Sequence, residues 1–263
     1  KRAKAPLVYN PHELETRTPT MTGVKKTLAE QVEARFIRRC QVVTAVNDEI
    51  ADWYAGHYRI ARPLVVVNYP AKVTRGRPAR DLRGELGLRD DEVLFVHTGH
   101  LTEGRNIPLI LEEFAAGARH HVLFVGAGDM QSLVEEAAAR SPFIHRMDPV
   151  PPDEVVSVVA GADMSLALIE TLSQSYAWGS PNKLFEALAA GVPVLASDVP
   201  EVRRRLGSLA GDLVLTSPKD QLGAFLARLD RSAALSYRKQ LAPLPTWEEG
   251  IGPMVEAYQR LLA

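Results

Sequence analysis

The sequence predicts an α/β protein in which parallel strands alternate with helices. Three observations predict this class. Short apolar runs of strand length alternate with helix-forming segments along most of the chain. Several of these runs end at a glycine or at a polar residue suited to cap a following helix. The stretch Ser175–Pro200 reads as a loop, a short helix and a buried strand in one unit.

Length and charge limit the function classes. The chain has 263 residues, enough for one large domain or two moderate ones. Its 31 Lys and Arg residues balance 32 Asp and Glu residues, so nucleic acid is not expected as a partner. No apolar run approaches the roughly 20 residues that cross a bilayer, and no signal-peptide pattern is present at the start. The single cysteine, Cys40, excludes an internal disulfide and favours a reducing, cytoplasmic setting.

The first expected strand covers residues 7–9 and leads into a loop that carries His12, Glu13 and Glu15. Ligands of open α/β sheets bind at the carboxyl ends of strands, so these side chains are candidates for a site. The alternative for His12 is a histidine that only caps its loop.

The next segment, residues 24–39, predicts a basic helix. Its cationic side chains fit either the solvated face of a helix that covers a sheet or a contact with anionic lipid headgroups. The residues expected to form its buried apolar stripe are Leu28, Val32, Phe36 and Ile37.

A strand over residues 42–47, a helix over 49–58 capped by Asn47 or Asp48, and a strand over 63–67 follow in order. This βαβ order implies parallel strands. The charged stretch 71–90 has little apolar periodicity, so we expect a domain junction near residues 69–80.

The second part of the chain opens with an apolar strand over residues 93–98 that ends at Gly99. A glycine directly after a strand lets a ligand approach the backbone closely. Arg105 precedes a helix expected over 107–117, where a guanidinium is placed for a phosphate.

A further strand over residues 121–125 runs into the turn Gly126-Ala127-Gly128 and a helix over 130–140. Such a turn also begins dinucleotide-binding folds. A dehydrogenase would continue this turn as Gly-x-Gly-x-x-Gly, and no third glycine follows Gly128 at that spacing, so this alternative is disfavoured. The other expected elements are strands at 143–147, 164–169 and 213–215, and helices after the cap Asp153 and at 201–206, 218–229 and 247–262.

The stretch Ser175–Pro200 carries the polar groups of most interest. Ser180 or Asn182 is expected to cap a helix over residues 183–190, Gly191 to end it in a left-handed conformation, and 192–196 to form a strand. A helix N-terminus with Lys183 favours a phosphate, and Glu186 one turn later is able to accept hydrogen bonds from sugar hydroxyls. The alternative is a solvated Lys–Glu pair on an ordinary helix.

The string PNKLFEALAAGVPVLASD resembles the nucleotide-binding helix of GT-B glycosyltransferases, in particular the retaining family 4 (glycosyl transferases group 1) and its Pro-Asn-Lys subgroup. The loop of His12 resembles the family's Tyr-Asp-x-His-Glu-Leu stretch, and the segment from Gly99 to Arg105 resembles its diphosphate-contacting Gly-x-Leu-x-x-x-Arg segment. Two departures are Asn106-Ile107, where Lys-Gly is frequent, and Trp178, where many members have a first glutamate.

The resemblance implies roles for individual residues. Glu186 would hold the ribose, while Arg105 and Lys183 would stabilise the leaving diphosphate. His12, Arg105 and Lys183 are the implied catalytic residues, and His12 and Glu13 the acceptor-side residues. The implied donor-binding residues are Gly99, Arg105, Gly126, Gly128, Pro149, Ser175, Tyr176, Asn182, Lys183, Leu184 and Glu186.

The family likeness also implies a GT-B fold of two Rossmann-like domains with parallel sheets. Residues 1–75 are expected to be the C-terminal part of an incomplete acceptor-side domain, 76–245 the nucleotide-sugar domain, and 246–263 a helix crossing back to the first domain. The chain begins with Lys1 rather than Met, so we expect that its true beginning is missing or was removed.

The expected activity is transfer of a sugar, with retention, from a nucleoside diphosphate sugar to an acceptor hydroxyl in polysaccharide, glycolipid or glycoside biosynthesis. A UDP-sugar is favoured as donor. The resemblance implies that no cofactor or metal is required, and no Asp-x-Asp motif is present. Base, sugar, acceptor and oligomeric state stay open, as does peripheral contact with the inner face of a membrane through the missing half. The alternatives are a non-catalytic nucleotide-sugar-binding subunit and a sugar-nucleotide epimerase of GT-B fold.

Overall fold

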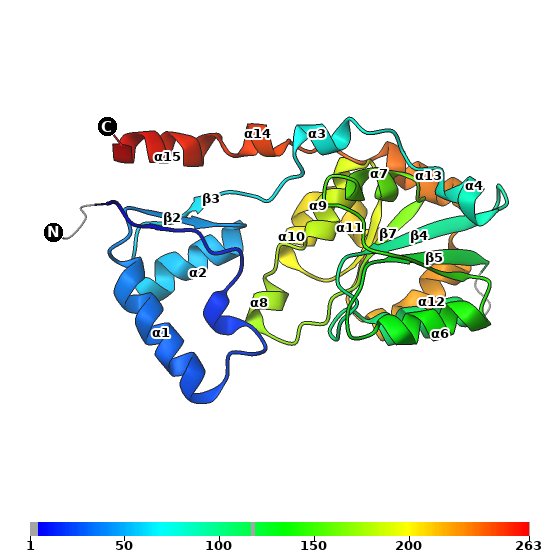
Figure 1. Cartoon of the computed structure of the whole chain (residues 1–263), viewed down its shortest axis with the longest axis horizontal. Coiled ribbons are helices and arrows are strands. Elements are labelled where there is room, and N and C mark those ends of the chain that lie inside the picture. Colours follow the sequence, from blue (N-terminus) through cyan, green and yellow to red (C-terminus); the bar gives the residue numbers. More distant parts are fainter. Residues whose placement is uncertain (1–4, 117–118, 263) are drawn as a thin grey trace. The chain divides into compact units, whose positions relative to one another are not determined.

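A computed structural model describes residues 5–116 and 119–262. The chain forms two compact units (Figure 1). Segments far apart in the sequence make up each of them, because the chain leaves unit 2 after Glu170 and returns to it at Pro181. Unit 1 contains Lys1–Asn68, Thr171–Ser180 and Pro245–Ala263, and unit 2 contains Tyr69–Glu170 and Pro181–Leu244. The expected division at residues 75 and 245 stays a prediction.

Unit 1 is built on a small parallel sheet with the strand order β1-β2-β3. Asn47 caps α2 as predicted, because its side chain accepts a hydrogen bond from the Ile50 N–H. The expected C-terminal helix is interrupted at Ile251, between two glycines, and forms α14 and α15. The elements are β1 (Val8–Tyr9), the 3₁₀ turn η1 (Glu15–Arg17), α1 (Gly23–Ile37), β2 (Val42–Ala45), α2 (Asp48–Tyr58), β3 (Leu64–Val65), α8 (Gln174–Ala177), α14 (Trp247–Gly250) and α15 (Gly252–Leu262).

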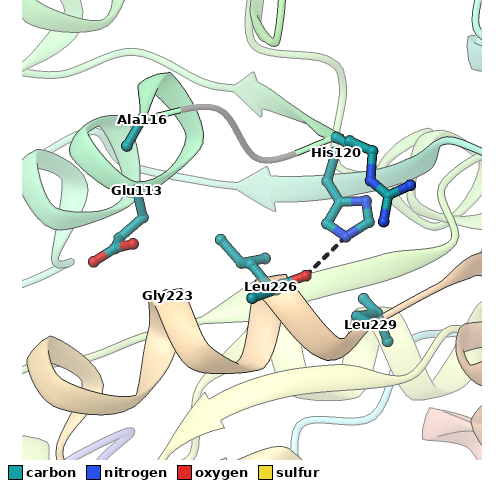
Figure 2. A pocket seen from close by; sticks show the side chains of 8 residues that line it. Glu113, Ala116, His120, Gly223, Leu226 and Leu229 are labelled. Atoms are coloured by element: carbon teal, nitrogen blue, oxygen red, sulfur yellow. Dashed lines mark hydrogen bonds between the residues drawn. The ribbon is translucent and has the colours of Figure 1, made fainter.

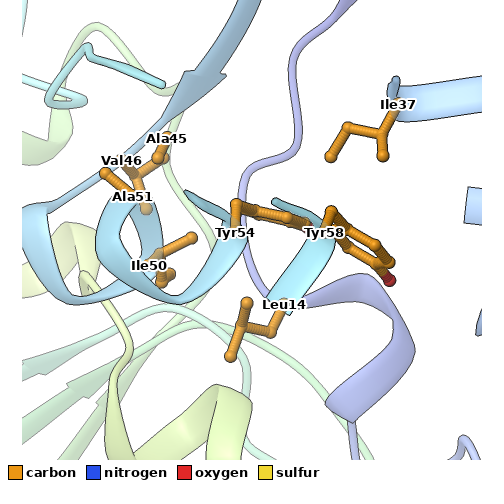
Figure 3. Close-up of a cluster of buried hydrophobic side chains, with 8 residues drawn as sticks. All are labelled: Leu14, Ile37, Ala45, Val46, Ile50, Ala51, Tyr54 and Tyr58. Atoms are coloured by element: carbon orange, nitrogen blue, oxygen red, sulfur yellow. The ribbon is translucent and has the colours of Figure 1, made fainter. Parts of the chain in front are cut away.

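Helix α2 supplies half of the buried core cluster of unit 1. Ile50, Ala51, Tyr54 and Tyr58 of this helix belong to one cluster of buried side chains with Leu14 and Ile37 (Figure 3). These side chains are at most 2% exposed. Their burial fixes α2 against the sheet and against the loop that follows β1.

A buried carboxylate completes this core. Glu33 of α1 accepts hydrogen bonds from the hydroxyls of Tyr9 (2.5 Å), Tyr54 (3.2 Å) and Tyr58, and from Thr16 (3.1 Å). Burial, followed by Glu33 itself, raises the pKa of Tyr9, Tyr54 and Tyr58 above their usual value. The hydroxyls therefore stay protonated and satisfy the carboxylate.

The predicted apolar stripe of α1 was wrong in three of its four positions. Leu28, Val32 and Phe36 are 57%, 56% and 49% exposed, and only Ile37 is buried. The physical reason is Glu33: the tyrosine hydroxyls draw this polar residue to the inner face of the helix. The apolar stripe is thereby turned outward from unit 1.

Unit 2 contains a six-stranded parallel sheet with the order β6-β5-β4-β7-β8-β9. From β4 the chain adds β5 and β6 on one side, and it then adds β7, β8 and β9 on the other side. The order of the strands therefore reverses between β4 and β7. Ligands of open α/β sheets bind outside the carboxyl ends of strands at such a point. The strands are β4 (Val93–Thr98), β5 (His120–Val125), β6 (Ile144–Met147), β7 (Met164–Ala167), β8 (Val194–Ser197) and β9 (Val214–Leu215).

Helices cover both faces of this sheet, with α6 and α12 on one face and α7 and α9 on the other (Figure 1). The predicted α/β class with parallel strands is therefore confirmed, and unit 2 is a Rossmann-like domain. The predicted end of α5, Gly117, lies outside the described residues. The helices are α3 (Lys72–Arg75), α4 (Leu82–Leu86), α5 (Ile107–Ala115), α6 (Gln131–Arg140), α7 (Val155–Ala160), α9 (Asn182–Ala189), α10 (Pro200–Leu206), α11 (Ala210–Leu213), α12 (Pro218–Arg228) and α13 (Arg231–Lys239), with the 3₁₀ turn η2 (Gly207–Leu209).

Among the residues that the structure describes, no helix is both long and apolar enough to cross a membrane.

Candidate nucleotide site

The loops that leave β4, β5 and β7 are tied together by backbone hydrogen bonds. Gly99 N–H donates to the Val125 carbonyl at 2.9 Å, and Leu101 N–H donates to the Ala127 carbonyl at 2.9 Å. The loop after β7 joins them, because Glu170 N–H donates to the Gly104 carbonyl at 3.0 Å. The carboxyl edge of the sheet is therefore held as one preformed surface beside the point where the strand order reverses.

The two glycines of the Gly-x-Gly turn permit this close packing. Gly126 and Gly128 have φ angles of 155° and 154°. A Cβ added at Gly126 would lie 1.9 Å from the Gly99 carbonyl oxygen, and one at Gly128 would lie 2.4 Å from the Leu101 carbonyl oxygen. In the structure both glycines thus have a packing role. Their predicted contact with a donor stays a prediction.

Asn106 suits the backbone conformation in which the structure places it. It adopts a left-handed φ of 53° immediately before α5. Glycine is the residue most at ease in this conformation, and asparagine is among the few others that tolerate it. Asn106 thus occupies the backbone conformation for which a glycine at this position would be suited, and Arg105 lies just before it.

Helix α9 places Lys183 and Glu186 one turn apart, toward β4. Its predicted end is confirmed, since Gly191 has a φ of 67°. The predicted cap by Ser180 or Asn182 was wrong: the N-cap is Pro181, and it makes no side-chain capping bond. The cap expected from Asp153 at α7 was wrong as well, because that carboxylate pairs with an arginine instead.

The polar side chains of α9 meet the last two residues of β4. Lys183 Nζ lies 3.2 Å from His97 Nε2. Thr98 Oγ1 donates to Glu186 Oε2 at 3.1 Å. His97 and Thr98 are buried, and Lys183 and Glu186 are half-buried.

The electrostatics of this cluster favour an anionic ligand. Burial, together with the nearby Arg105, lowers the pKa of Lys183 from 10.5 to about 7, although Glu186 opposes this shift. Burial, and then the charges of Lys183 and Arg105, lower the pKa of His97 well below 6.5. Burial raises the pKa of Glu186, opposed by its bond from Thr98 and by Lys183. A phosphate would relieve the proximity of two cations.

The predicted site residues are divided between the units. Leu184 is fully buried, so its side chain packs in the core of unit 2, and Pro149 is exposed in the loop after β6. Unit 2 contains Gly99, Arg105, Gly126, Gly128, Pro149, Asn182, Lys183, Leu184 and Glu186, whereas unit 1 contains His12, Glu13, Ser175 and Tyr176.

Within unit 1, a residue predicted to bind the donor is hydrogen-bonded to a residue predicted to lie on the acceptor side. Ser175, expected to bind the donor, donates from its hydroxyl to Glu13 Oε2 at 3.0 Å and is 1% exposed. Glu13 was expected on the acceptor side, and His12 beside it is exposed. The Ser175–Glu13 bond attaches the segment 171–180 to unit 1.

Sequence reasoning missed His97 and Thr98 as site residues. The available signal was a polar pair at the end of an otherwise apolar strand, Val93–Val96. In the chain from residue 5 to 116 and from 119 to 262, no group of three or more His, Cys, Asp or Glu residues is arranged to hold a metal ion.

A separate pocket lies at the amino end of β5, opposite the cluster just described (Figure 2). Glu113 of α5, His120 of β5 and Gly223 of α12 line it, and the His120 ring bonds the Leu226 carbonyl at 3.0 Å. None of the predicted site residues contributes to this pocket.

Fold and cluster together define a Rossmann-like α/β protein with a charged site at the carboxyl edge of its parallel sheet. The sequence model of the family described as Glycosyl transferases group 1 matches residues 92–233, more than half of the chain. The chain therefore belongs to this family. No curated protein matches its sequence.

Solved glycosyltransferases of the GT-B class share the fold. Sucrose-phosphate synthase from Thermosynechococcus elongatus is 17% identical with a TM-score of 0.70, over 97% of this chain and 67% of that protein. Alr3699/HepE from Anabaena, solved with UDP-glucose, is 14% identical with a TM-score of 0.65, over 98% and 71%. TarM from S. aureus, solved as the G117R mutant with fondaparinux, alpha-GlcNAc-glycerol and UDP, is 11% identical with a TM-score of 0.64, over 98% and 51%. The chain thus spans between about half and about two thirds of these proteins' length.

Proposed function

We propose that unit 2 binds the nucleoside diphosphate of a sugar donor and that the chain belongs to a retaining glycosyltransferase of family 4, in the Pro-Asn-Lys subgroup. One observation carries the proposal: Lys183, with its pKa lowered to about 7, lies beside Arg105 and one turn from Glu186 at the carboxyl edge of the sheet. A diphosphate supplies the anion that favours the charged form of Lys183.

The roles of the residues follow from their chemistry. Arg105 and Lys183 stabilise the negative charge that develops on the diphosphate as the sugar leaves. Glu186 accepts hydrogen bonds from the ribose hydroxyls. His12 and Glu13 are proposed to contact the acceptor hydroxyl, and no metal or cofactor is required.

UDP is the proposed nucleotide. Alr3699/HepE was solved with UDP-glucose, and the pneumococcal O-GlcNAc transferase GtfA with UDP and GlcNAc. The transferred sugar is proposed to enter a polysaccharide, glycolipid or glycoside. The proposed location is the cytoplasm, with the option of peripheral attachment to the inner face of a membrane.

Calorimetric titration with UDP, GDP and their glucose conjugates tests the donor site. We expect saturable binding of UDP that is lost in Glu186→Ala and retained in Glu112→Ala, which removes an exposed carboxylate from α5. Equal binding by both variants would show that Glu186 does not hold the ribose.

A second candidate is a nucleotide-sugar-binding subunit without transfer activity. Two observations favour it: Trp178 stands where many family members have a glutamate, and the Ser175 hydroxyl is engaged by Glu13. Release of UDP from UDP-glucose in the presence of a mixed set of hydroxyl acceptors would exclude it.

A further inference from the structure

Strand β4 ends in two buried polar residues that its position in the sheet does not require. The strand lies between β5 and β7 and begins with four fully buried apolar residues, Val93–Val96. His97 and Thr98 follow at 0% and 3% exposure. Because burying a polar side chain costs free energy unless it is hydrogen-bonded, an apolar residue would serve the sheet at either position.

His97 is buried with one of its two ring nitrogens left without a hydrogen bond among the described residues. Its Nε2 faces Lys183, while its Nδ1 is buried and makes no hydrogen bond to any residue that the structure describes. The ring packs at 5.4 Å from the ring of Phe124 on the neighbouring strand, a contact that a larger apolar side chain would also make. Stability of the sheet therefore does not account for a histidine here.

The partners of both residues are the two α9 side chains assigned to the nucleotide. His97 Nε2 lies 3.2 Å from Lys183 Nζ, and Thr98 Oγ1 donates to Glu186 Oε2 at 3.1 Å. Both partners are electrically neutral. Thr98 carries a hydroxyl, and the pKa of His97 is held well below its usual value by burial. The groups that face Lys183 are His97 from β4, Arg105 from the loop after β4 and Glu186 from α9.

Neutral partners have a specific advantage in this place. A second carboxylate beside Lys183, in the place of His97, would orient the ammonium but would also compete with a phosphate for its charge. An imidazole nitrogen accepts one N–H and leaves the other two ammonium hydrogens, and the full charge, for the ligand. In the same way the Thr98 hydroxyl fixes one oxygen of Glu186 and leaves the other to accept from a sugar hydroxyl.

We propose that His97 and Thr98 are positioning residues of the nucleotide site: His97 aims the Lys183 ammonium at the diphosphate, and Thr98 aims the Glu186 carboxylate at the ribose. The inference rests on the proposed function of unit 2.

Opposite effects on stability and on binding distinguish this role from a structural one. His97→Leu replaces the ring by an apolar side chain of similar volume, so the melting temperature without ligand should stay equal or rise. The affinity for UDP should fall about tenfold, as expected when an orienting hydrogen bond to a charged group is lost. His97→Gln, which restores an acceptor, should recover most of the affinity. Affinity for uridine, which has no phosphate, should not change in either variant.

A matched control is His120→Leu. It removes another buried histidine of the same sheet, at the amino end of β5 and therefore far from the carboxyl edge where His97 lies. It should leave the affinity for UDP unchanged. If His97→Leu binds UDP as the wild-type chain does, or loses uridine and UDP affinity alike, the positioning role of His97 is wrong while the donor site stands.

Thr98→Val tests the second pair by a double-mutant cycle. Thr98→Val and Glu186→Gln should each weaken binding of UDP, and their combination should be no weaker than Glu186→Gln alone, because Thr98 acts through Glu186. Additive losses would contradict this role. Absence of UDP binding by the wild-type chain would instead contradict the proposed function, and with it the inference that rests on it.

Discussion

Because of Lys183, the affinity for the donor should fall as the pH rises, whereas the free energy of unfolding should increase. The pKa of Lys183 is lowered to about 7 in the folded chain from 10.5, first by burial and then by Arg105. Between these two values the unfolded chain binds the proton and the folded chain does not, so the free energy of unfolding should rise with pH. A diphosphate requires the charged ammonium, so its affinity should fall over the same range.

The size of the effect follows from the titration of one group. With a pKa near 7, Lys183 is roughly 90% charged at about pH 6 and roughly 3% charged at about pH 8.5. If the bound diphosphate holds the ammonium fully protonated, the affinity falls by at most about thirtyfold, or about 2 kcal/mol, between these two values. His97 stays neutral throughout, since its pKa is well below 6.5.

Calorimetry with UDP-glucose measures the effect, because its diphosphate is esterified at both ends and does not titrate in this range. Buffers of different ionisation enthalpy should also reveal proton uptake on binding at the higher pH. Lys183→Arg keeps its charge and should flatten the profile, whereas Lys219→Met, which removes an exposed lysine from α12, should leave the profile unchanged. A flat profile in the wild-type chain, or an unchanged slope in Lys183→Arg, would refute the reasoning.

Three further predictions concern stability and are checked by denaturant unfolding. Gly126→Ala should destabilise unit 2 by about 3 kcal/mol or more, because its Cβ would lie 1.9 Å from the Gly99 carbonyl oxygen. Gly56→Ala, in the interior of α2 with no atom within 4 Å, should instead stabilise unit 1 by about 0.5–1 kcal/mol. Glu33→Leu should destabilise unit 1 by about 3–5 kcal/mol, since it removes the carboxylate that accepts from three buried tyrosine hydroxyls, whereas Gln31→Leu at an exposed position of α1 should change little. Equal effects within either pair would contradict the proposed causes.

Local signals predicted the α9–β8 unit closely. The sequence indicated a helix over 183–190, and α9 covers Asn182–Ala189. The good helix formers and the left-handed Gly191 act within a few residues of one another, so no knowledge of the tertiary fold was needed. The same holds for Asn47 as the cap of α2.

Patterns that depend on distant partners were not predictable. The periodicity of α1 indicates an apolar face, but which face is buried depends on tyrosines from β1 and α2 that bond Glu33. The segment 171–180 joins unit 1 through Ser175 and Glu13, which are far apart in the sequence. Hydrophobic periodicity describes only the pattern of residues along one helix and carries no information about either of these interactions.

The Gly-x-Gly turn shows that one residue pattern has two physical causes. A glycine after a strand indicates a close approach, and the family resemblance predicts that a ligand makes this approach. At Gly126 and Gly128 the closest groups are the carbonyls of Gly99 and Leu101, so packing of the loops requires glycine whether or not a ligand is bound. The pattern locates the carboxyl edge of the sheet but does not say what approaches it.

His97 and Thr98 illustrate the converse case, in which a weak pattern gains meaning only from its partners. A polar pair at the end of an apolar strand is commonplace, because strands end where the chain returns toward solvent. Here both residues are buried, and each bonds one of the two α9 side chains that the nucleotide would need. Since a buried polar group without such a purpose reduces stability, the presence of two of them on β4 argues that the strand holds α9's charged groups in place at some expense to the stability of the sheet.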